Sequence, residues 1–580
     1  MKRLCPTLAL LVLAAVIARA ESSPPRSPRN ANYTIEVTLD PDARLLTGRQ
    51  VVRWRNREQQ PTRELRFHLY WNAWRNDQST WMREDRYRER RALEEPGPED
   101  WGYVEVESAR LGEVDLLPGA RFLALDDGNA QDRTVWRLQL PAAVLPGGEI
   151  ALTLRWRARV PSFFARTGVR GDFYFIAHWF PALGVFETGG WNCHQFHAAT
   201  EFFSDYGAYD VTITLPSAFV VGATGRERER RDHGDGTTSH RYLAEDVHTF
   251  AWTASPHYVV IADGFAAEGL PPVDLRLLLQ PEHRAQAERH LAATKAALEL
   301  YGRWYGPYPY PTLTVVDPAW SSDAGGMEYP TMFTAGTRRW NPPAGGEPEG
   351  VTIHEAGHQF WYGIVGNDEF EHAWLDEGIN TFSEERALAE VYGEPALVHR
   401  FFAPPGLDEE EGFFPVLLPG YSRGGRVHLD RLDNYRPHAT SDVQRHESWR
   451  YDPASGRRLT YNKTSLWLGT LERRFGWETL RAVLATFFAR GSFGHPTPDD
   501  FLHAARAVGG TEFADAVTAF LTDDDFDYAV QSAVSVPAEA SGLVEEEGAL
   551  VLREPEDPTP ETAYRSEVVV RRHGSGAFPV

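Results

Sequence analysis

Cysteine is nearly absent from this chain of 580 residues, which contains only Cys5 and Cys193. Cys5 lies in an N-terminal segment with the features of a cleaved leader, so Cys193 has no partner within the mature chain. Disulfide bonds within the chain therefore do not stabilise the folded protein. This excludes the disulfide framework on which many small exported domains depend.

Long apolar runs are also lacking after the first twenty residues. No later stretch approaches the roughly 18 apolar residues that a membrane-spanning helix needs, so the sequence predicts no transmembrane anchor. The first twenty residues have a basic start at Lys2 and Arg3, an apolar run from Leu8 to Ile17 and a small-residue ending. This pattern is typical of a secretory signal peptide. We expect residues 1–20 to be removed and the mature protein to be secreted or periplasmic.

Positive charge is in short supply, because 59 Lys and Arg residues face 82 Asp and Glu residues and the net charge is −23. Phosphate backbones and anionic lipid surfaces repel such a chain, so the sequence predicts no nucleic-acid partner and no anionic membrane partner. We also find no internal repeat. The hydrophobic content of 42% and the 18 Trp residues are ample for large cores, and the length implies several domains.

The sequence does contain a HExxH motif, HEAGH, from His354 to His358. Residues i and i+4 of a helix lie one above the other, so the two imidazoles can bind one metal ion, and Glu355 can act as a general base without being a ligand. Eighteen residues separate His358 from Glu377 in the motif WLDEG, which is enough chain to turn and return on a second helix. Two His and one Glu form a catalytic zinc ligand set that leaves a fourth position open for water.

HEAGH, the spacer and WLDEG together resemble the aminopeptidase N family of gluzincin zinc metallopeptidases. The resemblance extends over about residues 32–526. It implies one zinc ion per chain, held by His354, His358 and Glu377, and peptides with free N-termini as substrates. It also implies an N-terminal antiparallel β domain beside a thermolysin-like α+β zinc catalytic domain with a helical extension, followed by the start of a C-terminal β domain.

Changes in residue pattern place the domain boundaries. Strand-like alternation runs from Asn32 to about Gly264, helical spacing begins near Glu282, and alternation returns after Gln531. The last segment ends without a polar tail, which is compatible with a truncated β domain, and the role of a Gly- and Arg-rich insertion at 420–453 is open. The predicted units are a signal peptide (1–20), an N-terminal β domain (21–268), a catalytic domain with its helical extension (269–528) and a C-terminal β segment (529–580).

The segment Gly325-Gly326-Met327-Glu328-Tyr329 resembles the GAMEN exopeptidase motif of the family, with Gly for Ala and Tyr for Asn. An extended peptide can add to an exposed strand through main-chain hydrogen bonds, which would fix its scissile carbonyl relative to the metal. The resemblance implies that Glu328 binds the free α-amino group of the substrate. The alternative is a solvated strand glutamate.

Three further groups of residues carry weaker signals. Tyr461 opens a stretch similar to the family's Tyr-x-Lys-Gly helix start, and its hydroxyl near a zinc ion could donate to a developing oxyanion, although a core tyrosine is the alternative. Asp172, which precedes the aromatic stretch Trp179-Phe180-Pro181, is a candidate for a second amine anchor. Cys193, His194 and His197 could form a second metal site, but packing and hydrogen bonding are the more common roles of such residues.

These patterns predict an exported zinc aminopeptidase that hydrolyses N-terminal residues from peptides with a zinc-activated water. A zinc endopeptidase or an epoxide-opening hydrolase on the same scaffold is one alternative, and a catalytically idle metal-binding protein is another. The preferred N-terminal residue and the oligomeric state are left open by the sequence.

Overall fold

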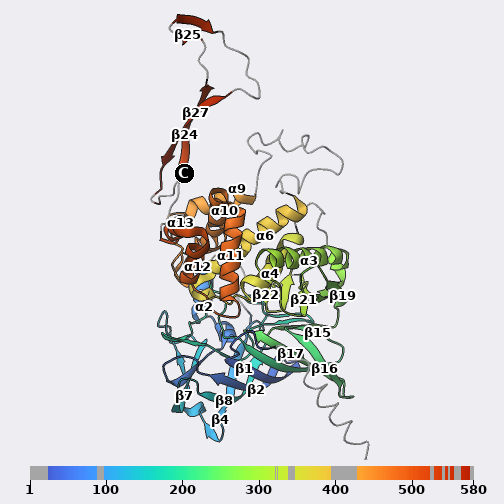
Figure 1. Cartoon of the computed structure of the whole chain (residues 1–580). Helices are drawn as coiled ribbons and strands as arrows, with labels where there is room; N and C mark the ends of the chain where they lie inside the picture. Colours follow the sequence, from blue (N-terminus) through green and yellow to red (C-terminus); the bar gives the residue numbers. More distant parts are fainter. Residues whose placement is uncertain are drawn as a thin grey trace, which may run out of the picture.

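A computed structural model describes residues 24–87, 97–320, 322, 324–337, 347–393, 427–452, 454–522, 528–538, 542–546, 549–553, 563–574 and 576. The predicted signal peptide and the first part of the 420–453 insertion lie outside these ranges. The N-terminal β domain lies at the bottom of Figure 1, the catalytic domain and its helical extension lie side by side above it, and a β-ribbon projects beyond the helices.

An eight-stranded sheet forms the base of the N-terminal domain. In β1 (Ala31–Asp40), Tyr33, Ile35 and Val37 are buried while the intervening residues are exposed, as period-two alternation predicts. The sheet is antiparallel except for the pair β1 and β14, which is parallel. The strand order is β16 (Arg226–Asp232), β17 (Thr237–Val247), β14 (Gly207–Pro216), β1, β2 (Leu45–Arg55), β8 (Glu149–Arg159), β4 (Tyr103–Leu111) and β5 (Val114–Asp115).

Smaller sheets complete this domain. One contains β15 (Val220–Ala223), β18 (Trp252–Ser255), β10 (Phe173–Ile176) and β9 (Gly168–Arg170); a second contains β11 (Ala182–Leu183), β3 (Thr62–His68), β7 (Val135–Val144) and β6 (Arg121–Leu123); a third pairs β12 (Val185–Glu187) with β13 (Gly190–Asn192). The short helix α2 (Thr80–Tyr87) follows a 3₁₀ turn at Tyr70–Trp74. The core is rich in Trp, and burial of each large apolar side chain stabilises the fold by about 1.5–3 kcal/mol.

The catalytic domain begins with a five-stranded sheet, in the order β19 (Val259–Phe265), β20 (Val273–Leu279), β21 (Thr312–Val316), β23 (Met332–Ala335) and β22 (Gly326–Tyr329). Strand β19 ends before the predicted boundary at 269, yet it pairs with β20. The catalytic sheet therefore starts earlier than the sequence suggested, because the strand-like pattern continues across the boundary and changes only at the helix that follows.

Helices cover this sheet and extend the catalytic domain. Helix α4 (Glu349–Trp361) packs between α3 (Ala287–Trp304), α6 (Glu377–Tyr392) and β22. A Cβ at Gly357 of α4 would lie 2.1 Å from Asn380 Oδ1 of α6, so this glycine allows the close approach of the two helices that carry the site. The remaining helices are α5 (Glu369–His372), α9 (Val427–Tyr435), α10 (Thr464–Phe475), α11 (Trp477–Gly491), α12 (Pro498–Ala504) and α13 (Gly510–Thr522).

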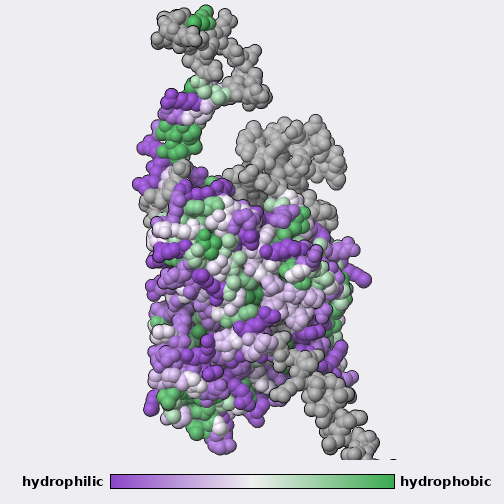
Figure 2. Space-filling model, in the orientation of Figure 1, coloured by the Kyte–Doolittle hydropathy of each residue, from purple (hydrophilic) through white to green (hydrophobic). Residues whose placement is uncertain are grey.

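The C-terminal segment forms the predicted strands. β24 (Tyr528–Pro537) pairs with β27 (Tyr564–Arg572), and β25 (Gly542–Glu546) pairs with β26 (Ala549–Arg553). Val530, Val534 and Val568 on the first ribbon are exposed, and the space-filling view shows hydrophobic residues along it (Figure 2). In the described ranges, the helices do not combine the length and the apolar character that a membrane crossing would need.

Polar contacts join the N-terminal domain to the catalytic domain. The Tyr206 hydroxyl donates to the carbonyl of Ile364 at 2.9 Å, and His248 Nε2 lies 3.1 Å from the carbonyl of Tyr362. Asn192 donates to Asp368 at 2.8 Å. Because most of these groups are buried, the contacts fix the β domain against the end of the HExxH helix.

Candidate active site

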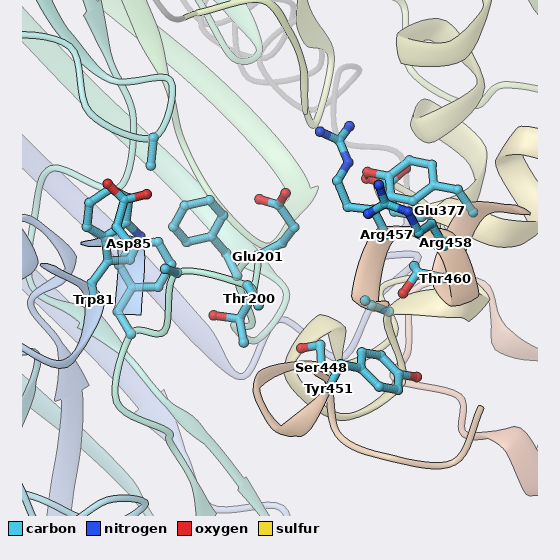
Figure 3. Close-up of a pocket in the computed structure, with 18 of the residues that line it drawn as sticks. Trp81, Asp85, Thr200, Glu201, Glu377, Ser448, Tyr451, Arg457, Arg458 and Thr460 are labelled. Atoms are coloured by element: carbon cyan, nitrogen blue, oxygen red, sulfur yellow. The ribbon is translucent and has the colours of Figure 1, made fainter. Parts of the chain in front are cut away.

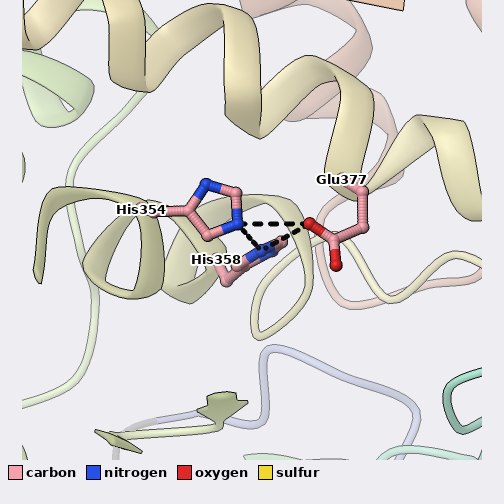
Figure 4. Close-up of side chains that lie close together, drawn as sticks. All are labelled: His354, His358 and Glu377. Atoms are coloured by element: carbon pink, nitrogen blue, oxygen red, sulfur yellow. Dashed lines mark hydrogen bonds and ion pairs between the residues drawn. The ribbon is translucent and has the colours of Figure 1, made fainter. Parts of the chain in front are cut away.

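Three side chains from two helices converge as the HExxH spacing predicted. On α4, the Nε2 atoms of His354 and His358 lie 3.1 Å apart. Each Nε2 lies 3.2 Å from Oε2 of Glu377, the first residue of α6 (Figure 4). Two imidazole nitrogens and one carboxylate oxygen that face a common point are a donor set that suits zinc.

Two carboxylates behind the imidazoles orient them. His354 Nδ1 lies 3.1 Å from Oε2 of Glu384, and His358 Nδ1 lies 2.6 Å from Oδ1 of Asp376. A carboxylate accepts the Nδ1 proton, which leaves the Nε2 lone pair of each ring for a metal. Burial by itself would lower the pKa of His354, but its contacts with Glu377 and Glu384 raise that pKa to about 10. The surroundings therefore favour positive charge at this place.

Sequence analysis missed the roles of both carboxylates, although simple signals for them existed. Asp376 precedes Glu377 within WLDEG, and Glu384 lies seven residues after Glu377, two turns along the same helix. Residues at that separation share a helix face, so Glu384 could have been found.

Glu355 lies beside the three ligands without belonging to them. It is buried on α4, and a Cβ at Gly326 would lie 2.2 Å from its Oε1, so the glycine of the GGMEY segment makes room for this carboxylate. Its Oε2 has no hydrogen-bond partner in the described part of the chain. Burial raises the pKa of Glu355 to about 7, which suits a group that must accept and release a proton near neutral pH.

The GGMEY segment forms β22 at the edge of the five-stranded sheet, where a substrate strand can add. Glu328 on this strand is only 3% exposed, and its Oε1 has no hydrogen-bond partner among the described residues. Burial raises the pKa of Glu328 well above its ordinary value. Its carboxylate lies close to Glu355 and His358. The alternative of a solvated strand glutamate is therefore wrong.

Tyr461 also reaches the site, from a π-helical turn at Arg458–Lys463 that leads into α10. Its hydroxyl donates to Glu377 Oε1, and its ring stacks on that of His354 with centroids 6.2 Å apart. The structure thus brings Tyr461 to the three converging side chains, and its role at an oxyanion stays a prediction.

A cavity of about 790 Å³ leads to this centre, and both domains line it (Figure 3). Arg166, Glu201 and Phe202 of the β domain line it together with Glu377 and Tyr461 of the catalytic domain, and Figure 3 shows Glu201 across the cavity from Glu377. The part of the 420–453 insertion that is described also lines the cavity, with Ser448, Tyr451 and Asp452.

Arg166 and Glu201 are polar lining residues that the sequence analysis did not identify. Arg166 Nη1 donates to Glu201 Oε1 at 2.6 Å. Asp172, the candidate suggested instead, does not line the described cavity. Its side chain is 66% exposed and lies 3.4 Å from His257, so this interpretation was wrong. Sequence position close to an aromatic strand could not show which side chain of the β domain turns toward the metal site.

Cys193, His194 and His197 do not form a second metal site in the described structure. His194 Nδ1 lies 2.8 Å from Asp126, and His197 Nδ1 lies 2.7 Å from Glu84, so carboxylates satisfy both rings. The thiol of Cys193 is buried. The more common role, packing and hydrogen bonding, is the one that the structure supports.

This histidine pair predicts a pH dependence of stability. Burial alone would lower the pKa of each imidazole, but hydrogen bonds to Asp126, with Glu371 for His194 and Glu84 for His197, raise both pKa values from 6.5 to about 9. The stabilisation is therefore complete below pH 6.5 and is lost as the pH rises through 9.

We expect the melting temperature to fall over this pH interval and to fall less steeply when His194 and His197 are both replaced by Gln. Differential scanning fluorimetry across the interval measures this effect. Parallel curves for the two proteins would contradict the assignment.

The fold and the site together define a metallopeptidase-type catalytic domain, with a His-His-Glu set of possible metal ligands on a thermolysin-like α+β scaffold beside a β domain. Residues 289–523 match the Peptidase family M1 domain. The chain therefore carries a peptidase family M1 domain, as the resemblance to the aminopeptidase N family predicted.

Comparison with known proteins agrees with this family. The chain is 28% identical over 191 residues to leucine aminopeptidase 2 of Neosartorya fischeri, which covers 32% of this chain and 29% of that protein. It is 33% identical over 195 residues to a leukotriene A-4 hydrolase homolog of Botryotinia fuckeliana, covering 32% of this chain and 28% of that protein. The matches thus span less than a third of the length of these curated relatives.

Solved structures support the same fold. The M1 zinc metallopeptidase from Deinococcus radiodurans superposes with a TM-score of 0.56 at 15% identity, over 85% of this chain and 95% of that chain. A structure of that enzyme bound to a Tyr-Ser-Ala substrate gives a TM-score of 0.55 at 14% identity, over 85% of this chain and 95% of that one. At this level of identity, the likeness concerns the fold.

Proposed function

We propose that this protein is a zinc-dependent aminopeptidase. The observation that carries the proposal is the position of the buried Glu328, whose Oε1 has no hydrogen-bond partner among the described residues, next to Glu355 and the converging His354, His358 and Glu377. A buried carboxylate without a partner is costly, and a substrate α-ammonium would supply its missing counter-charge. An endopeptidase binds no free amine, so its substrate would supply no counter-charge to such a group.

The residues of the site divide the work of peptide hydrolysis. His354, His358 and Glu377 would hold one zinc ion per chain, which when bound supplies Lewis-acid polarisation of the scissile carbonyl and of the attacking water. Glu355 takes the proton from the attacking water and returns it to the leaving amine. Tyr461 donates its hydroxyl to the oxyanion that develops on the carbonyl oxygen.

Substrate recognition falls to groups around this centre. Gly325, Gly326 and Met327 at the edge of the sheet pair with the substrate main chain, and Glu328 binds its α-ammonium. Glu201 lines the cavity near this strand, since its partner Arg166 also contacts Met327, and it supplies a second carboxylate for the amine. The cavity volume of about 790 Å³ suits peptides of a few residues.

The cellular setting is part of the proposal. The leader-like residues 1–20 support export, and the mature protein would act outside the cytoplasm on peptides with free N-termini. The acidity of the chain supports the absence of nucleic-acid partners.

The intact Glu355 argues against a catalytically idle metal-binding protein, which would have no need of a general base.

Acetylation of the substrate amine provides the test. A peptide with a free amino terminus should have a kcat/KM about 100-fold or more above that of its acetylated twin, because the acetyl group leaves Glu328 buried without a counter-charge and displaces the scissile carbonyl. Glu328→Ala should lower this ratio chiefly by reducing kcat/KM for the free peptide, and Glu328→Gln, which keeps the shape and removes the charge, should do the same. A wild-type ratio near one would end the aminopeptidase assignment.

A further inference from the structure

The turn at residues 164–167 of the β domain has an uncommon backbone conformation. The amides and carbonyls of Phe164 and Thr167 bond to each other at 3.1 and 2.9 Å, which makes Ala165 and Arg166 a two-residue hairpin turn. Both turn residues have positive φ, 35° for Ala165 and 68° for Arg166. Turns of this kind favour Asn-Gly, because most other side chains are strained there.

Buried contacts on both sides hold this turn in place. The ring of Phe164 stacks on Trp74 with centroids 5.9 Å apart. The hydroxyl of Thr167 accepts from the amide of Ala177 at 3.1 Å. Strained backbone persists only where its surroundings determine it, and such positions cluster at functional sites. A turn held this firmly indicates a role for Arg166, the side chain that it presents to the cavity.

The guanidinium of Arg166 uses only one of its nitrogen atoms in hydrogen bonds to the described residues. Its Nη1 donates to Glu201 Oε1 at 2.6 Å and contacts Met327 Sδ at 2.9 Å. Within the described residues, Nε and Nη2 have no acceptor, and the side chain is 28% exposed along the cavity. Arginine binds carboxylates through two parallel N–H groups, so these free donors are suited to a carboxylate of a ligand.

The neighbours of Arg166 locate that ligand group. Met327 precedes Glu328, and Glu201 is the other carboxylate placed at the substrate amine, so both contacts of Arg166 lie beside the amine site. The first side chain of the substrate starts one carbon away from that amine. Glu328 and Glu201 are assigned to the α-ammonium, which leaves the positive charge of Arg166 to act on the side chain next to it. A positive first side chain would then be repelled by Arg166, and a negative one would be attracted.

We propose that Arg166 makes the cavity selective for peptides whose first residue has a carboxylate side chain, glutamate or aspartate, and selective against a first lysine or arginine. The inference rests on the proposed aminopeptidase function. The C-terminal carboxylate of a dipeptide offers the same chemistry, but it lies at the far end of the substrate from the amine. A structural role confined to holding Glu201 would leave Nε and Nη2 without a use.

Isosteric substrates test this proposal. The p-nitroanilides of Glu and Gln have the same shape, and neither has a C-terminal carboxylate. We expect kcat/KM for Glu to exceed that for Gln by about tenfold or more in the wild type. The ratio should fall to one or below in Arg166→Met, while the relative rate for the Lys derivative rises. Arg166→Lys keeps the positive charge but loses the two parallel N–H donors, so it should retain part of the preference for Glu over Gln.

A matched control separates the turn from its side chain. Ala165→Gly relaxes the same turn and keeps the guanidinium, so it should raise the melting temperature and leave the Glu/Gln ratio unchanged. A wild-type ratio at or below one, or a ratio that survives Arg166→Met, would overturn the proposal. A preference for Leu-Gly over Leu-Gly-amide that disappears in Arg166→Met, without a Glu/Gln preference, would assign the carboxylate to the C-terminus and overturn the side-chain assignment.

Failure of the proposed function would look different, because no aminoacyl substrate would turn over. Binding then provides the measurement, with free L-glutamate and L-glutamine as probes in calorimetry on the Glu355→Gln variant. Tighter binding of glutamate that is lost when Arg166→Met is added would support the role of Arg166. Equal binding of the two amino acids would contradict it.

Discussion

Replacing Glu355 by Gln should remove most of the peptidase activity while leaving the metal content and the fold intact. The amide has the size of the carboxylate but cannot accept the proton of the attacking water. General-base catalysis contributes about 10²–10⁴ to a rate, so we expect kcat to fall by about a thousandfold. The metal should remain, because the three ligand atoms come from His354, His358 and Glu377.

The measurement combines kcat with zinc content by mass spectrometry and with the melting temperature. Glu349 provides a matched control, since it is a buried glutamate on the same helix whose carboxylate binds Arg289. Glu349→Gln can lower stability but should keep kcat within a few-fold of the wild type. Turnover close to normal in Glu355→Gln would require a different general base.

Replacing His358 by Ala should remove both the zinc and the activity. Loss of a side chain that only orients a metal ligand already costs about 10–100-fold in metal affinity, so loss of a ligand should cost more than that. The change also leaves Asp376, which is fully buried, without the imidazole that it contacts at 2.6 Å. The variant should therefore have a lower melting temperature as well.

Zinc affinity measured by competition with a chromophoric chelator tests this prediction independently of turnover. His372→Ala is the control, because His372 lies on α5 outside the ligand set and its loss should leave zinc binding unchanged. Retention of one zinc per chain in His358→Ala would contradict the ligand assignment.

The sequence predicted the parts of the site whose arrangement follows from helix geometry and short sequence spacing. His354 and His358 are one helical turn apart, and Glu377 follows in a motif with a fixed spacer, so their convergence could be expected from the chain alone. Glu328 and Tyr461 were proposed as site residues from short motifs. Their burial and contacts were not predictable, because these depend on how the sheet and the helical extension pack around the metal site.

The two cavity residues that were missed, Arg166 and Glu201, come from another domain. Glu201 lies 153 residues before His354 in the sequence, and Arg166 lies still earlier, so no periodicity or spacing relates them to the metal site. Only the packing of the β domain against the catalytic domain brings them into the cavity. The parallel pairing of β1 with β14 has the same origin, since strand alternation specifies which face is buried but not which neighbour is chosen.

The groups that break the peptide bond and Arg166, which we propose selects the first side chain, lie on different domains and can therefore evolve separately. The groups that break the bond are on the catalytic domain, where replacing a metal ligand or the general base is costly, whereas Arg166 and Glu201 are on loops of the β domain. Point mutations in those loops can therefore change which peptides such an enzyme prefers, while the residues that hydrolyse the bond stay the same. Engineering of substrate preference can accordingly start at Arg166 and Glu201 without changing the metal ligands.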